Sequence, residues 1–287
     1  MYCKHLNLNV EVDVLTTGAL ADIVSGILES LLFQRHQIPL VYKTYRYYVE
    51  KWSDEENELS DEKVTSTAQF LRRQKENATK TNSSIRAMKE LVRNAFNNKF
   101  IKSLRFLFGS TAYTPKEAYT IHIPTEAISS NHSHEQHRIA IGKLNQTLLS
   151  FLTHPDLSTI FSSNLNPTNI YLELEIAKQT VDLKTMSNAK VDMIAKEFYA
   201  LPASCKDVQI HLLHKGNASL TSLHCCKDLQ VYKDFMDLHL EDNVTVDADS
   251  DSNKCKNILY KTTEWWEADI YIRGFKEQGS KCLNMWS

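Results

Sequence analysis

Three short runs of the sequence hold residues that could bind a metal ion, and each lacks part of the required ligand set. The run NHSHEQH at 131–137 has no Cys or Asp ligand pair nearby, and a polar loop that leads into a helix explains it. In the run HCC at 224–226, adjacent cysteines cannot chelate one ion well. Residues 247–258 begin with EF-hand spacing, but Ser stands where Gly is needed and Ile where Glu is needed. We therefore predict no metal site.

The short motifs that mark common enzyme sites are absent from the sequence. It contains no GxxxxGK[ST], GxGxxG, GxSxG or HExxH, and its seven glycines make a phosphate-binding loop improbable. A Cys–His dyad could in principle be assembled from six cysteines and eleven histidines, but nothing in the sequence selects a pair. We therefore predict that the protein is not an enzyme and needs no cofactor.

A polar pair continues the apolar stripe of the first predicted helix. The stripe consists of apolar residues at helical spacing, namely Leu20, Ile23, Val24, Ile27, Leu28, Leu31 and Leu32. Gln34 and Arg35 follow Ile27 and Leu28 by seven residues, so both project from nearly the same side as the stripe. Either the helix end enters solvent just before Pro39, or it offers hydrogen-bond donors to a partner.

The composition is that of an ordinary globular chain. Of 287 residues, 42% are hydrophobic and 24% charged, and the formal charge of -2 does not indicate bulk attraction to nucleic acid or to anionic membranes. No apolar run approaches the ~20 residues that a membrane span needs, and the N-terminal segment has no signal-peptide layout. The six cysteines include no CxxC pair, so reduced thiols are expected. We expect a nucleocytoplasmic protein that binds neither nucleic acid nor membrane.

Hydrophobic periodicity predicts a single α+β domain over residues 1–287. Alternating apolar residues predict strands at 10–14, 104–108, 119–123, 170–176 and 208–212. Helical spacing predicts a helix that ends near Arg35, a short helix after Pro39 and two further main helices at about 64–98 and 134–153. The aromatic side of the short helix, which holds Tyr42, Tyr45, Tyr48 and Trp52, is predicted to be core.

Two segments depart from this periodicity. Residues 53–63 read SDEENELSDEK and are predicted to form a solvated acidic linker. Residues 214–258 lack the apolar content to pack alone and are predicted to form a loop insertion, partly helical or not. Two tryptophans and the strand-like run ADIYIRGF follow this insertion.

Three blocks of the sequence resemble, in order, the comet family, which binds the spindle-checkpoint component mitotic arrest deficient two, here called MAD-two. The blocks are FQRHQIPLVY, FLFGSTAYTPKEAYTIHIP and TTEWWEADIYIRGFKE. The resemblance extends over residues 10–213 and is absent from 214–258. It implies a HORMA-like fold, in which a mixed or antiparallel sheet packs against three main helices and residues 259–287 form a seatbelt-type segment.

The resemblance also implies a binding surface. In comet proteins the end of the first helix and a face of the third helix dock onto the closed conformer of MAD-two. Gln34 matches the contact glutamine of the family, and Arg35 stands beside it. The family's aromatic contact on the third helix corresponds to Leu148, which we group with Leu144 and Phe151 as one patch. Core packing is the alternative for each residue of this patch.

A second partner is implied, an AAA+ remodelling ATPase of the thyroid-receptor-interacting or pachytene-checkpoint type. The family presents a Pro-Lys pair to it, and counting back from Leu201 and Pro202 places Ala195 and Lys196 there, without the proline. The implied function is an adaptor that delivers closed MAD-two to the ATPase, promotes disassembly of the mitotic checkpoint complex and so permits mitotic exit. It implies a nuclear and cytoplasmic location, with the spindle or kinetochore in mitosis.

Two other functions remain open at this point. A HORMA scaffold of the meiotic or repair type would use its seatbelt to capture a peptide. An unrelated α+β protein would share only its general architecture with HORMA proteins. Binding to closed MAD-two distinguishes the adaptor from both.

Overall fold

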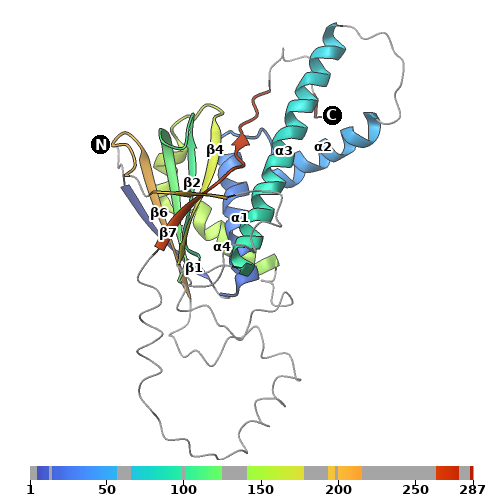
Figure 1. The fold of residues 1–287 in the computed structure, drawn as a ribbon. Coiled ribbons are helices and arrows are strands. Elements are labelled where there is room, and N and C mark those ends of the chain that lie inside the picture. Colours follow the sequence, from blue (N-terminus) through green and yellow to red (C-terminus); the bar gives the residue numbers. More distant parts are fainter. Residues whose placement is uncertain are drawn as a thin grey trace, which may run out of the picture.

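The computed structural model describes residues 5–12, 15–56, 66–98, 101–124, 141–177, 193–197, 200–214, 263–277 and 285–286. These residues form one mixed sheet with helices packed against it (Figure 1). The helices are α1 (Thr17–Gln34), α2 (Tyr42–Glu56), α3 (Ser66–Asn98), α4 (Ile141–Leu152) and α5 (Pro155–Phe161). The strands are β1 (His5–Val12), β2 (Ile101–Gly109), β3 (Pro115–His122), β4 (Asn169–Ala177), β5 (Met193–Lys196), β6 (Lys206–His214), β7 (Thr263–Ala268) and β8 (Ile272–Arg273).

The strands lie side by side in the order β1-β6-β3-β2-β4-β7-β5, and β8 pairs with β4. β6 runs parallel to both of its neighbours, β1 and β3, whereas the other pairs are antiparallel. Parallel strands need a long connection, and the paired residues His5 and Asp207 are indeed 202 positions apart. The predicted α+β class with a mixed sheet is confirmed.

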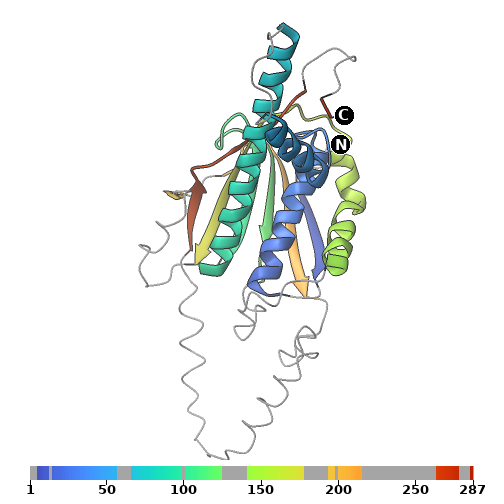
Figure 2. The ribbon, with the colours of Figure 1, turned by 90° about the vertical axis from the view of Figure 1, so that its right-hand side faces the viewer.

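The core lies between this sheet and one layer of helices. Leu104, Phe106 and Phe108 alternate along β2, point to the helix side and are fully buried. On that side α1 lies against the sheet, with α3 on one flank and α4 on the other (Figure 2). The start of α1 is capped by Thr16, whose Oγ1 accepts a hydrogen bond from the Ala19 N–H at 3.1 Å. The three main helices expected to cover the sheet are thus α1, α3 and α4.

The third main helix, α4, ends at Leu152, within one residue of the predicted end, and a break at His154 separates it from the short helix α5. The ring Nδ1 of His154 accepts a hydrogen bond from the Asp156 N–H at 3.4 Å, and Pro155 begins α5. Proline suits the first position of a helix, where its missing N–H has no partner to lose. Residues 134–140, where the helix was predicted to begin, lie outside the described residues.

The predicted linker and insertion fall largely on residues that the structure does not describe. α2 continues to Glu56, so it takes in the first four residues of the acidic linker predicted at 53–63. Of the insertion predicted at 214–258, only His214 is described, at the end of β6. Of the segment predicted at 259–287, the structure places β7 between β4 and β5, pairs β8 with β4 and describes residues 285–286.

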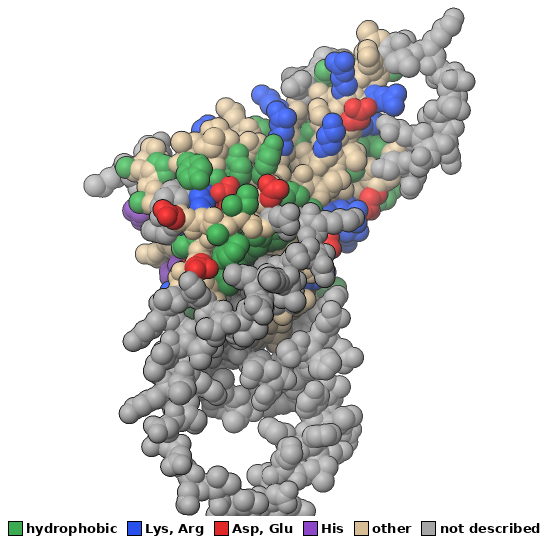
Figure 3. All heavy atoms as spheres, in the orientation of Figure 1, with side chains coloured by type: hydrophobic (Ala, Val, Ile, Leu, Met, Phe, Trp, Pro, Cys, Tyr) green, Lys and Arg blue, Asp and Glu red, His purple; other side chains and the backbone are tan. Residues whose placement is uncertain are grey.

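Helices α2 and α3 extend beyond the sheet and form an arm (Figure 1). Lys and Arg side chains gather on the outer part of this arm (Figure 3), and the exposed ones on α3 include Arg72, Arg73 and Lys80. Neither α3 nor any other helix in the described ranges is both long enough and apolar enough to cross a membrane.

Candidate functional site

The end of α1 turns sharply, and this turn decides which side chains face outward. The Gln37 N–H donates to the Leu32 carbonyl at 2.8 Å, and the His36 N–H donates to the Phe33 carbonyl at 3.0 Å. This pair of bonds is the Schellman arrangement, which requires a left-handed residue after the helix. His36 occupies that position, with a φ of 54°. The turn leaves Gln34 half-buried and Phe33 exposed at the surface.

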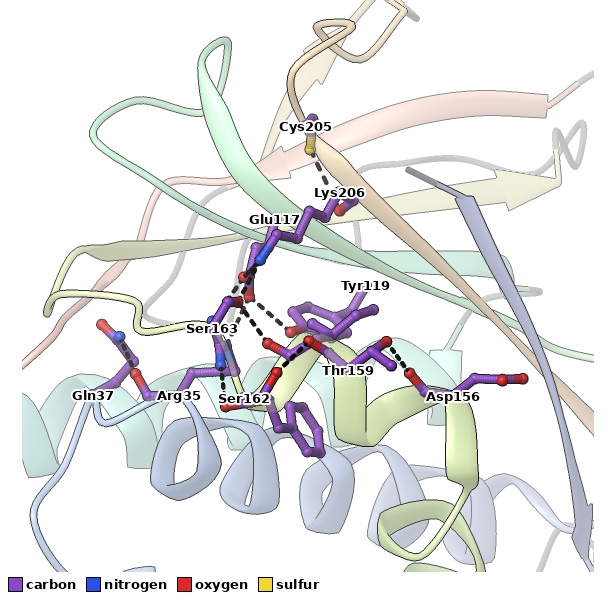
Figure 4. Close-up of polar contacts among 12 residues, drawn as sticks. Arg35, Gln37, Glu117, Tyr119, Asp156, Thr159, Ser162, Ser163, Cys205 and Lys206 are labelled. Carbon is purple, nitrogen blue, oxygen red and sulfur yellow. Dashed lines mark hydrogen bonds and ion pairs between the residues drawn. The ribbon is translucent and has the colours of Figure 1, made fainter. Parts of the chain in front are cut away.

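Arg35, the other half of the predicted polar pair, points inward. Its side chain is 0% exposed, and its Nε and NH2 groups donate to the two carboxylate oxygens of Glu117 at 2.8 and 2.7 Å (Figure 4). A third donor reaches the Phe161 carbonyl at 3.4 Å. The prediction that Arg35 offers donors to a partner at the surface is therefore wrong, because Glu117 on β3 already holds the guanidinium in a bidentate pair.

Glu117 is the centre of a buried polar network. Besides the Arg35 guanidinium, its carboxylate accepts hydrogen bonds from the Tyr119 hydroxyl at 2.8 Å and the Lys206 ammonium at 3.2 Å. Lys206 also donates to the Ser163 hydroxyl (Figure 4). Burial and the adjacent Glu117 charge raise the pKa of Tyr119 well above its ordinary value, so this phenol remains a donor. The network connects the end of α1 to β3, to β6 and to the loop after α5.

Gln37 has a structural role that the sequence did not reveal. Its side-chain Oε1 accepts a hydrogen bond from the Thr168 N–H at 2.8 Å, and its Nε2 donates to the Arg35 carbonyl at 2.6 Å. Its own carbonyl accepts a hydrogen bond from the Phe275 N–H at 2.7 Å. Of the polar residues in the block FQRHQ, Gln37 and Arg35 thus stabilise the fold, which leaves Gln34 as the polar residue of the last turn of α1 that can serve a partner.

On α4 the predicted patch faces the core more than the solvent. Phe151 is buried, and Leu144 and Leu148 are partly buried against the core. The packing is close: a Cβ placed on Gly26 of α1 would lie 2.6 Å from the Leu148 Cδ1 atom. For Phe151 the partner-facing prediction is therefore wrong, and the alternative of core packing holds, because its side chain is buried in the main hydrophobic core.

The exposed apolar residues of α4 are different ones. Leu149 is 60% exposed and Ile141 is 76% exposed, although both are large apolar side chains. Because α4 lies beside α1 (Figure 2), these side chains and the end of α1 belong to the same layer of the molecule. Sequence reasoning missed them because helical spacing shows which residues share a side, but not which side the core covers.

Lys196 is held in a second ionic network on the opposite face of the sheet. Its ammonium donates to Glu173 at 2.7 Å and to Glu267 at 2.6 Å, and it lies 4.2 Å from the centroid of the Tyr113 ring. Burial alone would lower the pKa of Lys196, but the two carboxylates outweigh burial and raise it. With its side chain only 8% exposed, Lys196 does not present a free ammonium, which corrects the expectation of a surface contact through this group.

The described residues contain no group of three or more His, Cys, Asp or Glu side chains arranged to hold a metal ion. The buried charges of both networks are paired with one another, as burial of charge requires. The arrangement is that of a scaffold with exposed apolar and amide groups on its helix layer, which can serve recognition.

Comparison with known proteins supports the same conclusion. The model of the p31comet family, described as "Mad1 and Cdc20-bound-Mad2 binding", matches residues 15–151. This region contains α1 to α3, β2, β3 and nearly all of α4. A search of curated proteins finds no match to the chain. The family match confirms the resemblance to the comet family and is consistent with the HORMA-like α+β fold.

Proposed function

We propose that this chain, which resembles the p31comet family over residues 15–151, binds closed MAD-two (Mad2) through the end of α1 and the outer side of α4. The observation that carries the proposal is Gln34, whose side-chain amide lies half-buried at the end of α1 without a hydrogen bond to another described residue. Exposed Phe33 lies next to Gln34 in the last turn of α1, and exposed Leu149 and Ile141 lie on the adjacent helix. These groups combine apolar area with one amide that can bond a partner.

The chemistry of this surface suits a protein partner. A stable interface of standard size buries about 1,600 Å² in total, and a few central apolar or aromatic residues supply most of its free energy. Large aliphatic side chains at 60% and 76% exposure would lose much contact with water when covered. A partly buried amide adds direction, since it must find a donor or an acceptor when water is excluded.

We further propose that the chain presents bound MAD-two to an AAA+ ATPase of the thyroid-receptor-interacting or pachytene-checkpoint type. Such an adaptor would silence the spindle checkpoint by promoting disassembly of the mitotic checkpoint complex, and it would act in the nucleus, the cytoplasm and at the spindle or kinetochore. Since Lys196 is held by two carboxylates, we assign the ATPase contact to its exposed neighbours on β5, Ile194 and Ala195. The family's function in recognition fits a protein that is not an enzyme.

The test of MAD-two binding is the substitution Gln34→Ala, measured by titration calorimetry with monomeric closed MAD-two. Loss of one interface hydrogen-bonding group costs about 1–3 kcal/mol, so the affinity should fall about five- to over a hundredfold. Gln69→Ala on the exposed side of α3 is the matched control and should not change the affinity. An unchanged affinity in folded Gln34→Ala would remove the end of α1 from the interface.

The contribution of α4 is tested by comparing Leu149→Asp with Leu213→Asp on β6. Leu149 is 60% exposed and Leu213 is 43% exposed, so neither substitution should unfold the protein. Leu149→Asp should weaken binding at least tenfold, because it would bury a carboxylate at the interface. Equal affinities for the two variants would show that α4 does not contact MAD-two.

A further inference from the structure

The aromatic side of α2 packs in part against α3. α2 belongs to the arm that extends beyond the main body (Figure 1), yet Tyr45 and Trp52 are almost completely buried. Tyr45 is fixed by a hydrogen bond from its hydroxyl to the Ala78 carbonyl of α3 at 3.0 Å. Trp52 has the Lys75 ammonium 5.3 Å from its ring centroid. Residues of α3 thus contact both rings, and a segment near the end of the sequence packs against them as well.

Met285 and Trp286 belong to that segment. Four aromatic rings surround the indole of Trp286. The distances between ring centroids are 4.9 Å to Trp52, 5.4 Å to Tyr45, 5.9 Å to Tyr48 and 6.2 Å to Phe275. We call these four rings the aromatic groove. The Trp286 Nε1–H donates to the Glu277 carboxylate at 3.1 Å, and Met285 is buried beside it. A side chain with four ring neighbours and a satisfied indole N–H is typical of a specific peptide anchor.

The residues that surround Trp286 lie on segments that other contacts hold in place. Tyr45 and Tyr48 are on α2, which packs against α3, and Phe275 is bound to the end of α1 through its N–H and the Gln37 carbonyl. Residues 285–286, by contrast, belong to no helix and no strand. Trp286 can therefore leave the groove without breaking a helix or the sheet, which is the property of a low-stability local unit.

We propose that the aromatic groove is a peptide-binding site for a segment in which an apolar residue precedes tryptophan, and that Met285–Trp286 occupies it as a displaceable intramolecular ligand. Glu277, the anchor of the indole N–H, is only nine positions from Trp286. A free peptide must therefore compete with an intramolecular segment, which has the advantage of a high effective concentration. A partner peptide with the same apolar-Trp pair binds when it competes with this segment or when the segment is removed.

The test uses the full-length chain with Trp286→Ala, which vacates the groove. The probe is a fluorescently labelled peptide QGSKCLNMWS, residues 278–287, made with Cys282→Ser to prevent oxidation. Fluorescence anisotropy should show saturable binding to the Trp286→Ala chain and at least tenfold weaker binding to the wild type, where the tethered tryptophan competes. The same peptide with Trp286→Ala should not bind at these concentrations.

Two adjacent tyrosines of α2 provide matched controls. Tyr48 contacts Trp286, whereas Tyr47 is 61% exposed and its ring pairs with Tyr48 instead. In the Trp286→Ala chain, adding Tyr48→Ala should weaken peptide binding at least tenfold, and adding Tyr47→Ala should leave it unchanged. Equal effects of the two substitutions would overturn the assignment of the groove.

Other results would also overturn the proposal. One is equal peptide affinity for the wild type and the folded Trp286→Ala chain, and another is a dimeric wild type whose groove holds the tryptophan of a second copy. If Trp286→Ala does not fold, Trp286→Phe takes its place, since it keeps a smaller ring in the groove. That chain should bind the peptide at least threefold more tightly than the wild type, and an unchanged affinity would refute the idea.

Discussion

Removal of the Glu117 carboxylate should destabilise the protein more than loss of any exposed charge. In Glu117→Ala the buried guanidinium of Arg35 loses both of its carboxylate hydrogen bonds and keeps only the longer contact with the Phe161 carbonyl. Tyr119 loses the acceptor of its hydroxyl at the same time. Lys206 is 27% exposed at its side chain and can turn toward water, so Arg35 determines the cost.

The magnitude follows from the burial of this pair. The side chains of Arg35 and Glu117 are 0% and 2% exposed, and removing one partner of such a pair costs about 3–5 kcal/mol. A natural domain has a free energy of unfolding of about 5–15 kcal/mol, so a large fraction would be lost. The double variant Arg35→Met/Glu117→Met should recover most of this loss, because no unpaired guanidinium then remains buried.

Urea denaturation followed by circular dichroism measures the effect. Glu50→Ala is the matched control, since Glu50 pairs with Arg46 on the surface of α2 with both side chains about half exposed. Such an exposed pair contributes about 0.3–0.5 kcal/mol, so the control should shift the midpoint very little. A loss below about 1 kcal/mol for Glu117→Ala, with an unchanged slope, would refute the view that Glu117 is required to neutralise Arg35.

Three further outcomes test the packing and the titrating groups. Gly26→Ala should raise the free energy of unfolding by about 0.5–1 kcal/mol in the Leu148→Ala background, because Ala favours a helix interior over Gly, and should raise it less or lower it in the wild-type background, where its Cβ would lie 2.6 Å from Leu148 Cδ1; equal urea-denaturation effects in both backgrounds would contradict this. Burial, with the adjacent His122, lowers the pKa of His211 from 6.5, so the unfolded chain binds this proton more readily and stability should fall as the pH drops below 6.5. A series of melting curves should show that His211→Gln weakens this dependence, and an unchanged dependence would contradict the reasoning. Burial raises the pKa of Cys205 to about 12, so iodoacetamide at neutral pH should label this thiol in urea but not in the folded protein, as read by peptide mass spectrometry.

Local periodicity was sufficient to predict most of the regular structure. The apolar stripe from Leu20 to Leu32 became the buried side of α1, and the alternation at 104–108 and 170–176 became β2 and β4, the centre of the sheet. The FQRHQ block and the block at 106–124 were sufficient to show the resemblance to the comet family, whose model matches residues 15–151. These features depend on the angle between neighbouring side chains, which any chain with the same spacing would share.

Tertiary structure decided the direction of each candidate site residue. Gln34 and Arg35 are neighbours in the sequence, but only Arg35 meets a buried carboxylate, and that carboxylate is 82 residues away. On α4, Leu148 packs over Gly26 of α1 while the next residue, Leu149, faces solvent. Lys196 meets Glu173 and Glu267 only because β5, β7 and β4 lie side by side, and Trp286 covers the rings of α2 from the other end of the chain. Spacing within one element determines which residues share a side, whereas the identity of the covering group depends on contacts between segments distant in sequence, which no local pattern encodes.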